Sequence, residues 1–312
     1  MTHLTALDGT PASPLCFGAM QFGGTADDAA SRAMFEACRA AGITFFDTAH
    51  VYTEGRSETL LGALVASERD GLIVATKAAY TGGASRANIL TSLDESRARL
   101  GMDVIDILYM HRWDGDVALE ETFETLASLQ DQGIVRYLGV SNYAAWQVMK
   151  AQAVAATFGT RIDVMQPMYN LVKRQAEVEL LPMAMDQDIA VAPYSPLGGG
   201  LLTGKYARGE EGRLRTDARY ATRYGVDWMH ETATALSALA DEIGADPATL
   251  AVAWVMAQPG ITAPIISARN KTQLAPSLAA ASFDLDAALR ARINALSRRP
   301  APATDRLEEA DI

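Results

Sequence analysis

Three consecutive apolar segments of the sequence end in polar side chains that could act together on one substrate. Asp47 ends the segment 43–47, Lys77 ends the segment 72–77, and His111 directly follows the segment 104–110. Tyr52 comes five residues after Asp47, close enough to lean over the same place. An acid, an amine, an imidazole and a phenol gathered at one point are suited to proton transfer.

Tyr52 is the candidate proton donor of this group. A free tyrosine titrates near pH ~10, too high for an efficient acid at neutral pH, and a nearby ammonium lowers that pKa. Lys77 could supply this charge if Asp47 holds it in place, because a buried lysine without a partner is costly. His111 could orient a substrate carbonyl or relay the proton. The set therefore suits protonation of a carbonyl oxygen while a hydride reaches the carbon.

Each of these residues also has a purely structural explanation. An Asp or Lys at the end of a strand is often half of an ion pair, and a buried His is often a satisfied core residue. A Tyr beside a barrel often only packs against its neighbours. Four complementary groups at the ends of successive strands favour a shared site over four separate structural roles.

The segments that must position these residues alternate regularly along the chain. Short continuous apolar runs are typical of parallel strands covered on both faces, and the segments between them have helical periodicity. Eight strand–helix units predict an α/β fold, a (β/α)8 TIM barrel with its active site at the carboxyl ends of the strands. An open doubly wound sheet is the alternative, weakened by the lack of a GxGxxG turn. The expected strands are 15–19, 43–47, 72–77, 104–110, 134–140, 163–166, 189–194 and 261–266, and the expected barrel helices are 26–41, 57–69, 85–100, 117–132, 143–158, 175–187, 247–257 and 271–280.

Three segments lie outside this repeat. The Asp8-Gly9 pair predicts an N-terminal β-hairpin over residues 4–14. The insertion 201–246 and the tail 284–312 are expected to contribute two additional helices, at 230–243 and 286–298. Because no linker or low-complexity tract divides the chain, residues 1–312 are expected to form a single domain.

Composition excludes several classes of protein. The 312 residues carry a net charge of −11, which disfavours binding to nucleic acid or to anionic membranes. Hydrophobic residues make up 49%, enough for a large core, but no stretch is long enough to span a membrane. Two cysteines and four scattered histidines offer neither a disulfide framework nor a metal site. No signal peptide is recognised, so a cytoplasmic location is expected.

Seven motifs resemble the aldo-keto reductases, in the order and spacing of that family. The likeness covers residues 15 to about 283, and it implies Tyr52 as general acid, supported by Lys77, Asp47 and His111. The motifs are FDTAHVYTEGRSETLLG (46–62), ATK (75–77), ILYMHRWD (107–114), GVSNY (139–143), MQPMYN (165–170), YSPLGGGLLTGKY (194–206) and IISARNKTQL (265–274).

The resemblance also implies a nicotinamide cofactor held without a Rossmann domain. It implies that Ser141, Asn142 and Gln166 grip the carboxamide and that Tyr194 stacks under the nicotinamide ring, although Tyr194 could instead be a packing residue. The further residues expected to contact the cofactor are Gly18, Ala19, Met20, Asp47, Ser195, Leu197, Gly199, Lys205, Ser267, Arg269 and Gln273.

Two segments point to phosphate. Gly199–Lys205 matches GxxxxGK, but a P-loop needs Ser or Thr where Tyr206 stands, so a pyrophosphate contact is the better interpretation. Arg269, at the expected start of the last barrel helix, favours NADPH over NADH because it could bind the 2′-phosphate, assisted by Gln273. Three positions depart from residues common in the family and place the adenine contacts in doubt: Ser267, Pro276 and Ser277.

The substrate side of the site is less specified. Trp113 is expected to line the pocket, with capping of the barrel as the alternative. The insertion carries basic residues at 208, 213, 215, 219 and 223 that face acids at 210, 211, 217 and 227. A solvated mobile lid is favoured over an anion funnel. The tail lacks aromatic residues near its end, so an open site that accepts varied aldehydes is expected.

The resulting prediction is an enzyme that reduces aldehydes or ketones with NADPH, with a small-molecule carbonyl compound as its partner. The oligomeric state is left open. One alternative is a sugar or alcohol dehydrogenase that prefers NAD⁺. A second is a cofactor-sensing regulatory subunit, as the potassium-channel β subunits of the family are.

Overall fold

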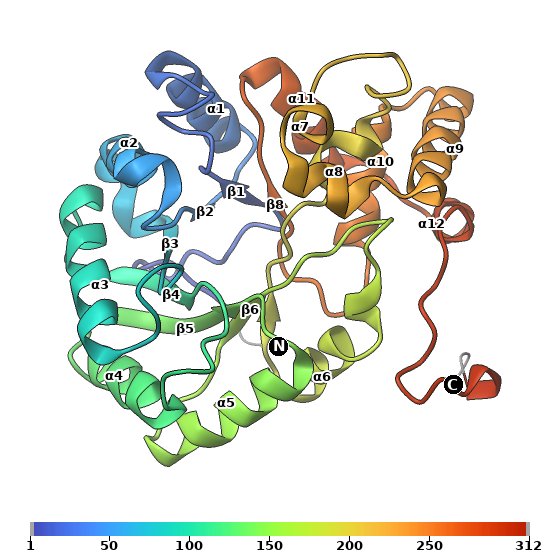
Figure 1. The fold of residues 1–312 in the computed structure, drawn as a ribbon. Helices are drawn as coiled ribbons and strands as arrows, with labels where there is room; N and C mark the ends of the chain where they lie inside the picture. Colours follow the sequence, from blue (N-terminus) through green and yellow to red (C-terminus); the bar gives the residue numbers. More distant parts are fainter. Residues whose placement is uncertain (1–2, 310–312) are drawn as a thin grey trace.

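Eight parallel strands form one sheet that closes into a barrel. The computed structural model describes residues 3–309, and the sheet order is β7-β6-β5-β4-β3-β2-β1-β8. The two ends of this order meet where the amide of Ile265 donates to the carbonyl oxygen of Pro193 at 2.8 Å, beside a parallel bridge between Tyr194 and Ile265. The predicted (β/α)8 barrel is therefore confirmed, and the open-sheet alternative is wrong (Figure 1).

The strands coincide with the predicted apolar runs: six are shorter than predicted, and β3 and β5 have the predicted length, shifted by one residue. The residues of β3 and β4 are buried along the whole length of each strand, as expected of parallel strands that lie between a filled barrel and a helix layer. The strands are β1 Cys16–Gly18, β2 Phe45–Asp47, β3 Ile73–Ala78, β4 Ile105–Met110, β5 Val135–Ser141, β6 Val164–Gln166, β7 Ala190–Val191 and β8 Ile265–Ile266.

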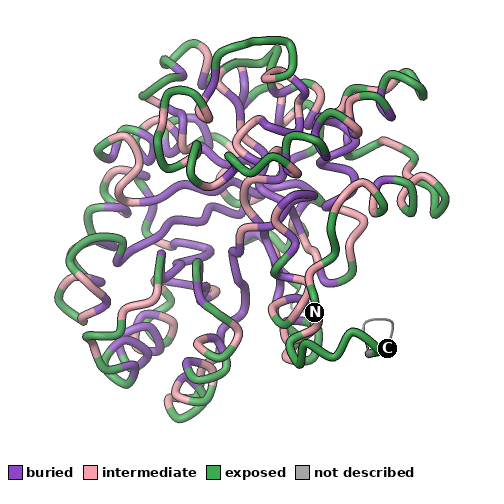
Figure 2. The backbone as a smooth tube through the Cα atoms, turned by 45° about the vertical axis from the view of Figure 1, so that its right-hand side comes forward, coloured by how far each residue is buried: buried purple, intermediate pink, exposed green. Residues whose placement is uncertain are grey.

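Helices cover the outside of the barrel, and their buried sides face the strands (Figures 1 and 2). Several begin with a side chain that accepts a hydrogen bond from the first turn, for example Asp27 before α1 and Ser85 before α3. Pro247 stands in the first turn of α10, as predicted. The helices are α1 Asp28–Ala40, α2 Arg56–Val65, α3 Arg86–Leu100, α4 Leu119–Asp131, α5 Ala145–Thr157, α6 Leu180–Asp186, α7 Arg213–Thr216, α8 Ala218–Tyr224, α9 Asp227–Ile243, α10 Pro247–Met256, α11 Lys271–Ala279 and α12 Ala287–Ala295.

Six short 3-10 helices complete the described secondary structure. The predicted helix over 175–187 is split, because a 3-10 turn and α6 share that segment. The predicted helix over 57–69 ends as α2 at Val65, and a kink with non-helical dihedral angles at Glu68 follows. The 3-10 helices are η1 Tyr52–Gly55, η2 Ala66–Gly71, η3 Gln175–Glu177, η4 Gly198–Thr203, η5 Ala280–Ser282 and η6 Leu307–Glu309.

The segments outside the barrel repeat are partly as predicted. The N-terminal hairpin is reduced to one antiparallel bridge between Thr5 and Pro11, which Arg136 secures by donating to the carbonyl oxygen of Thr5 at 2.6 Å. The two additional helices are α9 and α12. The insertion also contains α7 and α8, which were not predicted. Within residues 3–309, no helix is both long and apolar enough to cross a membrane.

Candidate active site

Alternation along the strands brings the predicted catalytic residues to one end of the barrel interior. Side chains of a strand point alternately inward and outward. Phe45, Ile73 and Ile107 belong to the cluster that fills the barrel. Asp47 lies two residues after Phe45, Lys77 four residues after Ile73, and His111 four residues after Ile107. These even spacings direct each side chain to the same side of its strand, toward the barrel interior. All three therefore arrive at the carboxyl ends of β2, β3 and β4.

Lys77 is bonded at the centre of this group. Its Nζ donates to Oδ1 of Asp47 at 2.5 Å and to the carbonyl oxygen of Thr48 at 2.6 Å. It also lies 4.9 Å from the centroid of the Tyr52 ring. The other oxygen of Asp47 accepts from Nε2 of Gln166 at 2.9 Å. The amine is therefore anchored by a carboxylate beside the candidate proton donor, as the sequence predicted.

The pKa of Lys77 is raised in this environment, so the amine keeps its proton. Burial lowers the pKa of the ammonium, but Asp47 and Tyr52 together, through their charges and hydrogen bonds, raise this pKa by more. Burial also raises the pKa of Asp47, and Lys77 opposes that effect.

The effect on Tyr52 corrects one expectation. Lys77 was expected to lower the pKa of this phenol below its ordinary value. Burial instead raises the pKa of Tyr52, and the ammonium of Lys77 offsets this only in part, because the carboxylate of Asp47 acts in the opposite direction. The physical reason is that Tyr52 faces an ion pair rather than a lone cation. The phenol therefore holds its proton through the neutral range, ready to donate it to a stronger base.

The turn that carries Tyr52 is strained and fixed from behind. Thr53 and Glu54 have left-handed dihedral angles with φ of 47° and 56°. Thr53 donates to the carbonyl oxygen of Phe22 at 2.8 Å and accepts from the amide of Ser57 at 2.9 Å. Arg99 donates to the carbonyl oxygen of His50 at 3.1 Å. These bonds hold the turn in the conformation that places Tyr52 over the barrel.

His111 is buried as a neutral imidazole. Burial, with Lys77 and Arg112 adding to it, lowers its pKa to about 3. Its Nδ1 finds no hydrogen-bond partner among residues 3–309. The rings of Tyr52 and Tyr80 lie 5.8 and 4.8 Å from its own. The imidazole is thus fixed by packing, with bonding capacity left for another molecule.

The side chains of Ser141 and Asn142, the backbone carbonyl of Gln166 and the hydroxyl of Tyr194 form one hydrogen-bonded group. Asn142 donates to the carbonyl oxygen of His111 at 2.9 Å and to Oγ of Ser141 at 3.1 Å. Ser141 in turn donates to the carbonyl oxygen of Gln166 at 2.9 Å. The hydroxyl of Tyr194 donates to Oδ1 of Asn142 at 2.8 Å. This chain of bonds links the ends of β5 and β6 and the segment after β7.

A cavity of about 980 Å³ opens at this end of the barrel. Lys77 and Ala19 are fully or nearly fully buried beneath it and do not line it. Trp113, expected at the pocket, packs instead against Tyr143 and Trp146, with centroids 5.2 and 5.6 Å away, and is also not among the lining residues. The predicted residues that line the cavity are Gly18, Met20, Asp47, Tyr52, His111, Ser141, Asn142, Gln166, Tyr194, Ser195, Leu197, Gly199, Lys205, Ser267, Arg269 and Gln273.

The far part of the cavity suits an anionic dinucleotide. Gly199 has φ of +66°, and a Cβ there would lie 2.7 Å from the Tyr220 ring, so only glycine fits beside the cavity wall. Oγ of Ser267 is buried and unpaired among residues 3–309, although it belongs to a residue that lines the cavity. Burial and the nearby charge of Arg269 lower the pKa of Lys205. A phosphate between these two cations would relieve their repulsion.

The insertion contributes more to the cavity than expected. Three predicted charge pairs are present, Arg208–Glu210 at 2.7 Å, Arg215–Glu211 at 3.6 Å and Arg219–Asp217 at 3.0 Å. Basic side chains of α7, α8 and the preceding loop line the same cavity as Tyr52, so the insertion forms part of the cavity wall, and its movement as a lid stays a prediction. These side chains are Arg208, Arg213, Arg219 and Arg223.

The lining residues that were not identified as site residues from the sequence include Tyr80, Arg112, Tyr220 and Arg223. Tyr80 lies three residues beyond Lys77, so the rule that selects strand ends could have found it. Arg112 directly follows His111 and faces Tyr80, with 5.1 Å between the guanidinium and the ring centroid. Tyr220 and Arg223 belong to α8, and nothing in their spacing predicts that they reach the barrel mouth.

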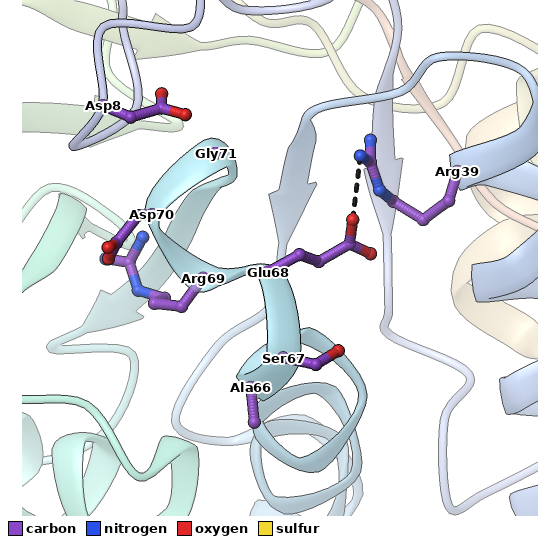
Figure 3. A pocket seen from close by; sticks show the side chains of 8 residues that line it. All are labelled: Asp8, Arg39, Ala66, Ser67, Glu68, Arg69, Asp70 and Gly71. Carbon is purple, nitrogen blue, oxygen red and sulfur yellow. Dashed lines mark ion pairs between the residues drawn. The ribbon is translucent and has the colours of Figure 1, made fainter.

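A second cavity, of about 380 Å³, lies between the end of α1 and the turn before β3 (Figure 3). Its charges are largely satisfied within the protein. Arg39 pairs with Glu68 at 3.0 Å, and Arg69 pairs with the buried Asp106 at 2.7 Å. This cavity adjoins the starts of the strands, the end of a barrel that contributes to stability rather than to catalysis. We therefore assign the chemistry to the larger cavity.

Comparison with known proteins agrees with this geometry. A sequence profile of the Aldo/keto reductase family matches residues 14–298. A "Probable voltage-gated potassium channel subunit beta" from Oryza sativa subsp. japonica is 34% identical, over 87% of this chain and 88% of its own length. The "Uncharacterized oxidoreductase YrpG" from Bacillus subtilis is 33% identical over 95% of both chains. "Norsolorinic acid reductase B" from Aspergillus parasiticus is 33% identical, over 84% of this chain and 75% of its own.

Proposed function

The chain belongs to the aldo/keto reductase family, and we propose that it is an NADPH-dependent oxidoreductase that reduces aldehydes and ketones to alcohols. The observation that carries this proposal is the position of Lys77. Its Nζ is bonded to Asp47 and lies 4.9 Å from the ring of Tyr52, whose side chain lines the large cavity. A positioned proton donor beside an anchored ammonium is what carbonyl reduction requires of a protein.

In this proposal the lining residues of the cavity hold the cofactor. Ser141, Asn142 and Gln166 would bind the carboxamide, and Tyr194 would lie against the nicotinamide. Lys205 and Arg269 would bind phosphate groups, and Arg269 precedes α11, whose N-terminus favours an anion. NADPH bound in this way supplies the hydride that reduces the carbonyl carbon.

The protein's own part in the reaction is to orient the carbonyl and supply the proton. Neutral His111 donates a hydrogen bond to the carbonyl oxygen from one ring nitrogen. Tyr52 gives its proton to that oxygen as negative charge develops there, because an alkoxide is a stronger base than a phenolate. Lys77 stabilises the phenolate that remains, and Asp47 keeps the ammonium in place. Reversal of the same path oxidises an alcohol.

A panel of aldehydes, ketones and sugars tests the proposal, with NADPH and NADH oxidation followed by absorbance in parallel assays. We expect turnover of aldehydes with a lower KM for NADPH than for NADH. A preference for NAD⁺ with sugars or alcohols would favour the dehydrogenase alternative. The single domain over residues 1–312 and the cytoplasmic location stay predictions.

A second candidate function rests on the names of two relatives. Proteins from Oryza sativa subsp. japonica and Arabidopsis thaliana, 34% and 32% identical to this chain, are each named as a probable voltage-gated potassium channel subunit beta. A regulatory subunit that senses the cofactor would bind NADPH but turn over no carbonyl in the panel. In a pull-down from its own cell extract, such a subunit would be recovered with one partner protein in stoichiometric amounts.

A further inference from the structure

Four arginines that line the large cavity form no ion pair among residues 3–309, namely Arg112, Arg213, Arg223 and Arg269. Arg213 donates to the hydroxyl of Tyr220, and Arg269 is assigned to the cofactor, which leaves Arg223 and Arg112. Among residues 3–309, Arg223 and Arg112 make no hydrogen bond or ion pair, whereas Arg208 and Arg219 beside them are paired with Glu210 and Asp217. Both unpaired side chains line the cavity that contains Tyr52. A protein with a net charge of −11 has many carboxylates available, so unpaired cations inside its main cavity call for an explanation.

Arg223 is the more enclosed of the two. It is half-buried, whereas Arg112 is exposed. Its guanidinium lies 5.4 Å from the centroid of the Tyr220 ring. Arg213 fixes that ring from a second position by donating to its hydroxyl at 2.9 Å. A guanidinium that rests on a fixed aromatic face is held in place while its edge donors stay free.

Arg223 lines the same cavity as Tyr52 and Tyr194. Lys205 and Arg269 line it as well and are assigned to the phosphate groups of the cofactor. Once these two cations are assigned, Arg223 is the half-buried arginine of the cavity that is left without a hydrogen bond or ion pair among residues 3–309.

We infer that the substrate carries a carboxylate in addition to its carbonyl group and that Arg223 binds this carboxylate, with Arg112 as a second, weaker contact at the cavity mouth. This inference rests on the proposed function. A carboxylate matches one half-buried guanidinium in charge and in its two-pronged geometry. Arg112 is exposed, so solvent screens its charge, and a phosphate monoester with nearly two negative charges would exceed the single half-buried charge of Arg223. An oxo acid is therefore the better fit.

Matched aromatic aldehydes test the inference with the full-length protein and NADPH. The probes are para-formylbenzoate, its methyl ester and para-formylphenyl phosphate, compared through KM and kcat. We expect the carboxylate to have a KM about tenfold below that of its ester, as one charge-assisted pair would give. This preference should weaken as salt is added. Equal KM values for acid and ester, or a preference for the phosphate, would overturn the inference.

The variant Arg223→Gln should remove the tenfold preference, and Arg223→Lys should restore part of it. In Arg223→Gln the KM for the methyl ester and for NADPH should stay within about twofold of the parent value. Arg215→Gln is the matched control, because Arg215 belongs to the same insertion but does not line the cavity. A larger effect of Arg223→Gln on the KM for NADPH than on that for the carboxylate would assign Arg223 to the cofactor instead.

Direct binding separates this inference from the proposed function. The probes are para-toluate and its methyl ester, which cannot be reduced, measured by calorimetry with the NADP⁺-loaded protein. Binding of para-toluate that Arg223→Gln weakens about tenfold, with no turnover of any aldehyde, would contradict the reductase but support the carboxylate site. Turnover of all three aldehydes without charge selectivity, or toluate binding that the variant leaves unchanged, would contradict the carboxylate site.

Discussion

Lys77 and Asp47 form an ion pair whose side chains are 0% and 4% exposed, with Nζ 2.5 Å from Oδ1. Such a pair is weak evidence for stability, because the cost of removing two charges from water offsets most of their attraction. Its position beside Tyr52 gives it a catalytic explanation. In the proposed reaction, the pair would keep a cation in the barrel mouth beside the phenolate that Tyr52 would form.

This relationship predicts strong coupling between the two positions. Asp47→Asn leaves the ammonium buried without a counter-charge and should lower the free energy of unfolding by about 3–5 kcal/mol. The double variant Asp47→Asn/Lys77→Met should regain much of that loss, since no buried charge is left unpaired. Chemical denaturation of both single variants and the double variant measures the coupling. Losses that simply add would show that the two side chains act independently.

Because His111 is buried as a neutral imidazole, we expect the folded protein to lose stability on acidification. Its pKa is about 3 in the folded protein and near 6.5 in the unfolded chain, so the unfolded state binds a proton first as the pH falls. Stability is therefore complete above pH ~6.5 and is lost progressively below it, by about 2 kcal/mol between pH ~7 and pH ~5.

Urea unfolding at these two pH values measures this loss. Between pH ~7 and pH ~5, the free energy of unfolding should decrease by about 2 kcal/mol less in His111→Gln than in the parent protein. His230→Gln is the matched control, because His230 is exposed on α9. An unchanged pH dependence in His111→Gln would mean that the imidazole is not buried in neutral form.

We expect Arg269 to determine the preference for NADPH over NADH. Arg269→Ala should raise the KM for NADPH at least about tenfold, because a charge-assisted bond to the 2′-phosphate is lost, and should leave the KM for NADH nearly unchanged. Lys271→Ala is the control, since Lys271 begins α11, two residues after Arg269, but does not line the cavity. If the preference for NADPH survives in Arg269→Ala, another residue binds that phosphate.

Close packing of α2 against α3 at Gly62, behind the turn that carries Tyr52, leads to a prediction about stability. A Cβ at Gly62 would overlap the backbone carbonyl of Leu100, so α2 and α3 are in direct contact there. Gly62→Ala should destabilise the protein by about 1–3 kcal/mol, because this steric cost exceeds the gain of about 1 kcal/mol in helix propensity. Ala63→Ser, on the exposed side of α2, should cost less than about 1 kcal/mol in thermal or chemical unfolding.

The sequence predicts the barrel and the positions of the candidate catalytic side chains because both depend on local patterns. Continuous apolar runs mark the strands, and alternation within a strand decides that Lys77 points inward like Ile73. Because the strands are parallel and in close register, the ends of neighbouring runs meet. The proximity of Lys77 to Asp47 therefore follows from strand order and alternation alone.

Features that depend on distant partners were not predicted. Trp113 follows β4 closely, but which side its ring takes is decided by Tyr143 and Trp146, which follow a different strand. The path of α8 over the cavity depends on contacts of Tyr220 and Arg223 that no local period indicates. The pKa of Tyr52 depends on the balance between burial and two opposite charges, and that balance is set by the three-dimensional arrangement of the groups.

The most direct test of the central claim is single-turnover reduction of a carbonyl substrate by Tyr52→Phe loaded with NADPH. Removal of the phenolic hydroxyl takes away the proton donor and little volume. We predict that cofactor binding, followed by nicotinamide fluorescence, stays within about twofold, while hydride transfer slows at least about 100-fold. Hydride transfer at the parent rate in Tyr52→Phe would contradict the account.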